Sequence, residues 1–163
     1  MSETRWLDDR EQAVWRSYLA ATRLLAAQLD RELQQDSGMP HTYYEILVRL
    51  SESPDRTLRM SQLADASDSS RSRLSHAAAR LEENGWLVRE SCPTDRRGAF
   101  ARLTDAGFAA LAAAAPAHVE SVRTHLLDPL TPEQVSLLGE ISEAILRGLR
   151  SHGAADCDGT DAR

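Results

Sequence analysis

At 163 residues, with 42% hydrophobic and 27% charged side chains, the chain has the length and composition of one globular domain with its own core. No apolar run approaches the roughly 20 residues that span a membrane, because Asp, Glu or Arg interrupts every segment. The first residues also lack the basic and apolar pattern of a secretion signal, so we expect a cytoplasmic protein.

The formal net charge of −6 argues against a nucleic-acid partner until its distribution along the chain is considered. The segment from Arg59 to Arg102 holds eight Arg and six Asp or Glu, a net of +2, whereas the rest holds eleven Arg and nineteen acids, a net of −8. This basic centre in an acidic chain predicts that any contact with DNA is concentrated there.

The residues that usually carry catalysis or bind metals form no recognisable motif. Cys92 and Cys157 lack metal-ligand spacing, and we expect no disulfide between them. The sequence also shows no nucleophile and base in a known arrangement and no glycine-rich loop of the kind that cradles phosphate. We therefore expect neither an enzyme nor a bound cofactor.

The first two predicted elements are helices. Apolar residues recur at three- and four-residue steps over 8–36, which predicts a long helix that ends at Gly38. A shorter helix is predicted over 43–51, with Thr42 as its N-cap and Glu45 completing a capping box. Each helix is expected to turn one apolar face toward the core.

A helix-turn-helix is predicted in the basic centre. Its first helix covers residues 59–66, with Ser61 as a candidate N-cap. A serine-rich turn follows, and the second helix is predicted over 70–84. Gly85 is suited to the left-handed conformation in which many helices end.

A β-hairpin is predicted directly after the helix-turn-helix. Short apolar runs over 86–90 and 100–103 predict two strands, and residues 93–98 form the tip between them. Thr104 then caps a further helix, which is predicted over 105–127. The hairpin is therefore expected to lie between two helices.

The C-terminal part of the chain is predicted to be helical. Pro116 inside an Ala-rich helix predicts a bend near residues 112–116 or two helices there. The run Thr131-Pro132-Glu133-Gln134 predicts the start of a last helix that continues to Arg150. Residues 151–163 are polar and contain glycine, so we expect a disordered tail.

The second helix of the predicted helix-turn-helix begins with side chains suited to a DNA groove. A helix that enters the major groove exposes short polar and cationic side chains near its N-terminus, where serine bonds phosphates or base edges and arginine binds guanine. A solvated, well-capped helix start has a similar composition, so this run does not decide the function alone. The candidate DNA-binding residues of this helix are Ser70, Arg71, Ser72, Arg73, Ser75 and His76.

The predicted hairpin tip is basic. Arg96 and Arg97 are adjacent there, and two arginines on a projecting hairpin can enter a minor groove as a wing does. Asp95 alone would repel phosphate, so we expect it to orient one of these arginines. An ordinary charged turn would also explain the tip, but a serine- and arginine-rich helix followed by this tip is specific to a winged helix-turn-helix.

Several short motifs of the basic centre occur together in one known family. They are Leu63-Ala64, Ser70-Arg71-Ser72, Arg80-Leu81-Glu82, Gly85, Thr94-Asp95-Arg96-Arg97-Gly98, Leu103-Thr104 and Gly107. With them the chain resembles the MarR-type winged helix-turn-helix transcriptional regulators. The order of the predicted elements extends this resemblance over residues 8–150.

The resemblance implies a mainly α fold with a small β-hairpin and six helices, which dimerises through its N- and C-terminal helices. Within one compact domain it implies an N-terminal dimerisation helix (1–37), a DNA-binding lobe (38–107), C-terminal dimerisation helices (108–150) and a tail (151–163). It also implies a repressor that binds a pseudo-palindromic operator in double-stranded DNA as a homodimer, with Arg97 in the minor groove.

Members of that family are often released from DNA by a small aromatic or anionic effector. The resemblance places its pocket between the dimer helices and the DNA-binding lobes. The same aromatic residues are equally suited to core and dimer packing, so this role stays open. The candidate pocket residues are Trp15, Tyr18, His41, Tyr43, Tyr44 and His118.

Three other interpretations remain open from the sequence. Cys92 lies among arginines, which favour a thiolate, so it is a candidate for a redox-responsive residue. His118 and His125 are seven residues apart with acidic residues nearby, a weak metal-binding pattern. The winged helix could also serve as a protein-interaction module whose acidic body is the contact surface.

Overall fold

The computed structural model describes the backbone of residues 4–67, 70–92 and 95–157, and the side chains of these residues other than 92, 95–97 and 152–157. The chain divides into two compact units, Met1–Ser121 and Val122–Arg163. No helix among the described residues is long and apolar enough to cross a membrane. The first unit holds the helix-turn-helix and the hairpin.

The first helix, α1 (Asp9–Ser37), confirms the prediction from the apolar repeat. Asp8 and Glu11 form a reciprocal capping box. The backbone N–H of Glu11 donates to the Asp8 side chain at 2.7 Å, and that of Asp8 donates to the Glu11 side chain at 3.0 Å. Gly38 ends the helix with a φ of 66°. The apolar stripe of α1 is exposed at Trp15 and Tyr18, half-buried at Leu25 and Leu29, and buried at Leu33.

Helix α2 (His41–Ser51) begins earlier than predicted, so the proposed capping box of Thr42 and Glu45 is wrong. Pro40 occupies the N-cap position, because its fixed φ directs the chain into the helix. The backbone N–H of His41 is satisfied from α1 by the carboxylate of Asp30, at 2.9 Å. The buried face agrees with prediction and consists of Tyr44, Ile46, Leu47 and Leu50.

The small sheet has three antiparallel strands in the order β1-β3-β2, one more than the sequence predicted. Strand β1 (Thr57–Arg59) pairs with β3 (Asp95–Leu103), and β3 pairs with β2 (Leu87–Cys92). A three-residue strand is too short to show an alternating pattern, which is why sequence analysis missed β1. It follows a tight 3-10 turn at Pro54–Arg56.

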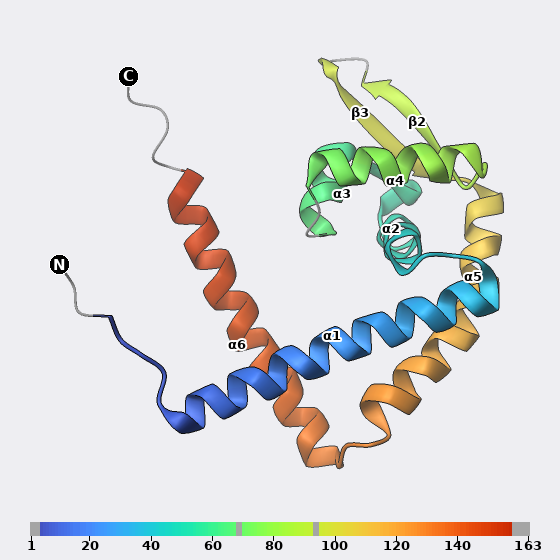
Figure 1. Cartoon of the computed structure of the whole chain (residues 1–163). Coiled ribbons are helices and arrows are strands. Elements are labelled where there is room, and N and C mark those ends of the chain that lie inside the picture. The colour runs from blue at the N-terminus through green and yellow to red at the C-terminus, as the bar shows by residue number, and fades with distance from the viewer. Residues whose placement is uncertain (1–3, 68–69, 93–94, 158–163) are drawn as a thin grey trace, which may run out of the picture. The chain divides into compact units, whose positions relative to one another are not determined.

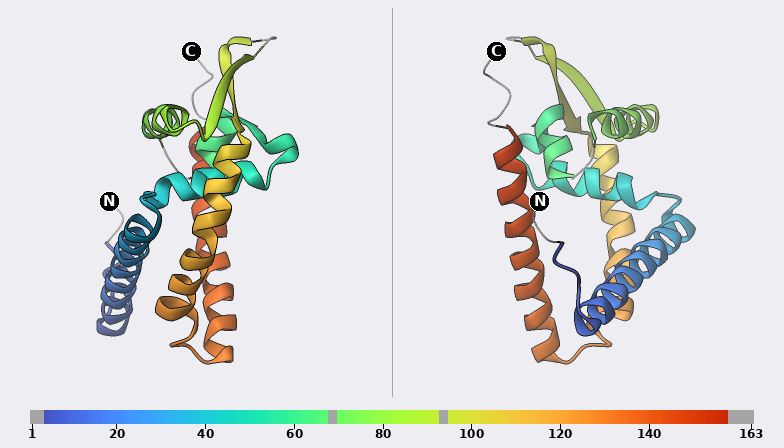
Figure 2. Two further views of the ribbon diagram at one scale, coloured as in Figure 1. Left: turned by 90° about the vertical axis from the view of Figure 1, so that its right-hand side faces the viewer. Right: turned by 60° about the vertical axis from the view of Figure 1, so that its left-hand side comes forward.

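The hairpin differs from the predicted one at its tip. Strand β3 already begins at Asp95, so residues 95–98 belong to a strand and not to the connecting turn. Pro93 and Thr94, the remaining residues of the predicted tip, lie outside the described residues. Figure 1 and both views in Figure 2 show the hairpin projecting past α3 and α4.

The helix-turn-helix consists of α3 (Met60–Ala66) and α4 (Arg71–Glu83). The predicted second helix begins one residue later than expected, and Ser70 caps it by accepting the backbone N–H of Arg73 at 3.3 Å. The predicted cap Ser61 is wrong, because it lies inside α3 and the Gln62 side chain instead accepts the N–H of Arg59, at 3.1 Å. The core side chains of the two helices are Leu63, Ala64, Leu74, Ala77, Ala78 and Leu81.

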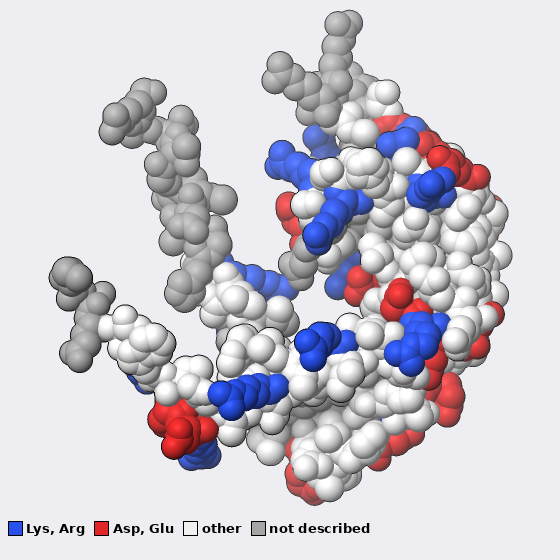
Figure 3. Space-filling view, viewed as in Figure 1, with Lys and Arg blue, Asp and Glu red and all other residues white. Residues whose placement is uncertain are grey.

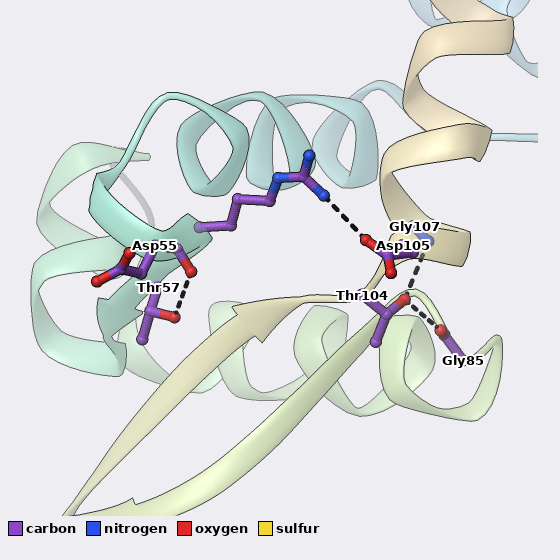
Figure 4. A network of polar contacts seen from close by, with 7 residues as sticks. Asp55, Thr57, Gly85, Thr104, Asp105 and Gly107 are labelled. Carbon is purple, nitrogen blue, oxygen red and sulfur yellow. Dashed lines mark hydrogen bonds and ion pairs between the residues drawn. The ribbon is translucent and has the colours of Figure 1, made fainter.

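The end of α4 is joined to the start of α5 (Asp105–Val122) by a polar junction, drawn in Figure 4. Gly85 has a φ of 71°, and the N–H of Trp86 reaches back to the carbonyl of Leu81 at 2.9 Å, as predicted for a helix that ends at glycine. Thr104 donates its hydroxyl to the carbonyl of Gly85 at 2.7 Å and accepts the N–H of Gly107 at 3.0 Å.

Helix α5 runs without interruption through Pro116, so the alternative of two helices at that point is wrong. The irregularity comes later, in a π-helical turn at Arg123–Leu127 that belongs to the second unit. In the same unit α6 (Pro132–Cys157) begins with the predicted capping box. The predicted end of this helix at Arg150 is wrong, because the helix continues to Cys157 and no proline interrupts the residues after Arg150. Residues 158–163 of the predicted tail lie outside the described residues.

Candidate nucleic-acid interface

The first two turns of α4 expose the polar and cationic side chains that the sequence singled out. Leu74 and Ala77 face the core, with 1% and 8% of their surface exposed, and they fix the orientation of the helix. Figure 3 shows arginine side chains over α3, α4 and the base of the hairpin. The exposed residues at this helix start are Ser70, Arg71, Ser72, Arg73, Ser75 and His76.

A cavity of about 330 Å³ lies where α3, α4 and β3 meet. Arg59 from β1 and Arg71 from α4 both border it, and Gly98 and Ala99 bring the wing strand to the same place. The guanidinium of Arg59 also lies 5.2 Å from the ring centre of Phe100. The fold therefore brings the helix-turn-helix and the wing to one basic surface, to which Arg59 adds a charge that the sequence did not single out.

Arg96 and Arg97 lie on β3, directly before Gly98. Their side chains, and that of Asp95, lie outside the described part of the chain, so the predicted orienting role of Asp95 stays a prediction. Cys92 ends β2, and its side chain is likewise outside the described set. The redox interpretation of Cys92 therefore also stays untested.

One ion pair joins the wing to α4 and another joins its two strands, and sequence analysis found neither. Arg89 on β2 pairs with Glu82 on α4 at 2.6 Å, and Arg102 on β3 pairs with Glu90 on β2 at 2.8 Å. The hydrogen bonds from the Arg89 side chain, and then from its backbone N–H, lower the pKa of Glu82. The carboxylate of Glu82 is therefore held in its charged form.

Three of the six candidate pocket residues lie together in the first unit. The ring of His118 on α5 lies 4.4 Å from that of Tyr44 and 5.3 Å from that of His41, both on α2. Burial, followed by the charge of His41, lowers the pKa of His118, and burial raises the pKa of Tyr44. This cluster is a partly buried polar site between α2 and α5.

The other candidate pocket residues lie elsewhere. Trp15 and Tyr18 on α1 stack on each other with ring centres 6.4 Å apart, and 50% and 44% of their surfaces are exposed. Tyr43 borders an open groove beside α4 with Arg73 and His76. In the part of the chain that the structure describes, no group of three or more His, Cys, Asp or Glu residues could hold a metal ion.

Comparisons by sequence and by structure both find regulators of the MarR family. The sequence model of the MarR family matches residues 37–98. The structure of Sco3205, a MarR family transcriptional regulator from Streptomyces coelicolor in complex with DNA, matches with a TM-score of 0.86 and 57% identity over 90% of this chain and 92% of that one. For AbsC, a MarR family transcriptional regulator from the same organism, the TM-score is 0.84 with 46% identity over 91% and 99% of the two chains.

A curated relative is more distant. The HTH-type transcriptional regulator MhqR of Bacillus subtilis (strain 168) is 26% identical over 108 residues, which cover 66% of this chain and 72% of the relative. The winged helix-turn-helix, the exposed serines and arginines of α4 and the likeness to Sco3205 over nearly its whole length agree. The chain belongs to the MarR family of transcriptional regulators.

Proposed function

We propose that the protein binds specific sequences in double-stranded DNA, with α4 in the major groove and the β2–β3 wing in the adjacent minor groove. The observation that carries this proposal is the outward-facing helix start from Ser70 to His76, which borders a cavity together with Arg59 and the wing strand β3. Short hydroxyls and guanidinium groups at a helix N-terminus suit base edges and phosphates. The DNA complex of the similar Sco3205 supports this assignment.

The same proposal includes a homodimer. Large apolar side chains are exposed on α1 and on α6, among them Trp15 at 50%, Ile141 at 55% and Leu149 at 66%. Apolar surface on this scale is stable in water when another chain covers it. A second copy brings a second α4 and a second wing, so the DNA site is a pseudo-palindrome with one half-site for each subunit.

On DNA the protein acts as a repressor in the cytoplasm, with no enzyme activity of its own. Another relative of this chain is named the transcriptional repressor MprA of Escherichia coli, 31% identical over 70 residues. A small aromatic or anionic effector that binds beside His41, Tyr44 and His118 would act on the position of α2 within the DNA-binding lobe. The partly buried imidazole of His118 supplies a hydrogen-bonding group for such a ligand.

Selection on random-sequence DNA tests the proposal. The purified protein is expected to enrich an inverted repeat whose half-sites lie about one helical turn, roughly 10 base pairs, apart. Light scattering on the same sample should give the mass of two chains. Enrichment of no sequence at low salt, or a protein that stays monomeric on DNA, would contradict the proposal.

A further inference from the structure

Glu82, near the end of α4, accepts three hydrogen bonds from one residue of the wing. The backbone N–H of Arg89 donates to Oε1 at 3.1 Å, and its Nε and Nη2 donate to Oε2 at 2.9 and 2.6 Å. Within the described ranges, these are the only side-chain hydrogen bonds that join α4 to the β2–β3 hairpin. One carboxylate therefore links the helix that carries the candidate base-reading residues to the strand that begins the wing.

This link lies where the hairpin leaves the hydrophobic core. Leu87 on β2 is 1% exposed, and Arg89 follows on the same face of the strand because side chains alternate. Ser91, the next residue on that face, is exposed. Beyond Leu87 the inward face of β2 is therefore held to α4 by the pair of Arg89 and Glu82, which replaces apolar packing with a contact of defined geometry.

The angle of the hairpin at this point decides where its far end lies. A strand rises about 3.3 Å per residue, so the end of β2 at Cys92 lies roughly 10 Å beyond Arg89. A rotation of about 10° at the base then moves that end by about 2 Å, well above the roughly 0.5 Å within which binding groups must be held. A loose base would separate the wing arginines from the groove that α4 selects.

We propose that Glu82 is a positioning residue for DNA recognition: through Arg89 it fixes the angle between α4 and the wing, so that both elements fit one duplex at the same time. This inference rests on the proposed DNA-binding function and assigns Glu82 no contact with DNA. It also predicts the sign of an effect. An acid that acted only by its charge would repel phosphate, so its removal would tighten binding, whereas loss of a positioning contact weakens binding.

Glu83 supplies a matched control. It is the next residue on α4, carries the same charge and pairs with Arg80 on the same helix at 2.7 Å, and not with a described side chain of the wing. Glu82→Gln and Glu83→Gln therefore remove one negative charge each from the same part of the helix. Only Glu82→Gln weakens the link to the wing, so the difference between the two variants isolates the positioning effect.

The experiment measures affinity for the duplex that the wild-type protein selects from random-sequence DNA. Glu82→Gln is expected to bind it about tenfold more weakly, the scale of one lost DNA contact, and Glu83→Gln as tightly as wild type or slightly more so. In a protein that already carries Arg97→Ala, Glu82→Gln should lower the affinity for this duplex little further, because both changes remove the same wing contact. Equal affinities of Glu82→Gln and Glu83→Gln, or full additivity with Arg97→Ala, would overturn the inference.

A second variant keeps the test decisive if Glu82→Gln lowers the melting temperature. Arg89→Lys retains the positive charge but replaces the planar fork that holds both Nε and Nη2 on Oε2. It is expected to weaken binding as well, at unchanged net charge, and unchanged affinity would count against the inference. If wild type binds no sequence, the proposed function fails too. If the wild-type protein binds its selected duplex and the Glu82 and Arg89 variants bind it equally tightly, the proposed function stands and only the positioning role fails.

Discussion

The centre of the imidazole ring of His118 on α5 lies 4.4 Å from that of the phenol ring of Tyr44 on α2 and 5.3 Å from that of the His41 ring on the same helix. Burial and the nearby His41 lower the pKa of His118, so the folded protein takes up this proton less readily than the unfolded chain. The carboxylate of Glu45 lies 3.8 Å from Nδ1 of His41 and so faces the same cluster of rings. Protonation of His118 is therefore expected to oppose the packing of α2 against α5.

The first prediction concerns stability against acid. Because the unfolded chain protonates this histidine first, the free energy of unfolding should fall as the pH drops below the ordinary value of 6.5. His118→Gln removes that contribution, so its free energy of unfolding should fall less between about pH 7.5 and about pH 5.5. Urea unfolding at both pH values measures the difference, with His76→Gln, an exposed histidine of α4, as the control. A variant with the wild-type pH dependence would refute the assignment.

The second prediction concerns the wing. Arg97→Ala should weaken operator binding and lower the slope of log affinity against log salt by about 1, because the proposed interface loses one positive charge. Titrations at several salt concentrations measure both quantities. Arg147→Ala removes the same charge from α6, where Arg147 pairs with Glu143 at 3.4 Å, and should leave the slope unchanged. An unchanged slope for Arg97→Ala would remove the wing from the DNA interface.

The third prediction separates the reading of bases from the binding of phosphates. Arg73 is exposed on the first turn of α4, and its replacement by Ala should relax sequence preference at one position of each half-site. Discrimination there is expected to fall by about 1–3 kcal/mol. Selection on random DNA with wild type and variant compares the two preferences directly. A selected motif identical to that of wild type would show that Arg73 does not read a base.

The fourth prediction concerns the junction that joins α4 to α5. A methyl group on Gly107 would overlap the carbonyl oxygen of Trp86 and lie 2.8 Å from Cδ1 of Leu103. Because backbone atoms cannot give way there, Gly107→Ala should destabilise the protein by about 1–3 kcal/mol or more. Gly139→Ala on α6 meets nothing within 4 Å and should instead stabilise by up to about 1 kcal/mol. Denaturant unfolding of both variants measures these opposite signs, and a neutral Gly107→Ala would contradict the packing described.

Features set by neighbouring residues could be predicted from the sequence. The caps at Ser70, Thr104 and Thr131 and the helix end at Gly85 each depend on bonds within a few residues, so their local signals were sufficient. Thr42 failed as a cap because Pro40 and Asp30, the latter from the preceding helix, determine where α2 starts. Local signals carry no information about such a partner.

Features that depend on distant partners could not be predicted. Strand β1 is defined by its pairing with β3, for example Leu58 opposite Ala101, and not by its own three residues. The contact between Glu82 and Arg89 depends on the angle at which the wing leaves α4. Among the candidate pocket residues, the sequence supplied the aromatic and histidine side chains, but only the fold shows that His41, Tyr44 and His118 meet while Trp15 and Tyr18 do not join them.

The central claim is that α4 and the wing together recognise a DNA sequence. The most direct test compares the affinity of the wild-type protein for its selected duplex with its affinity for a scrambled duplex of equal length and composition. Both are measured at one salt concentration of about 150 mM. We predict that the selected duplex binds at least about 10³-fold more tightly. Equal affinities for the two duplexes would contradict sequence-specific recognition.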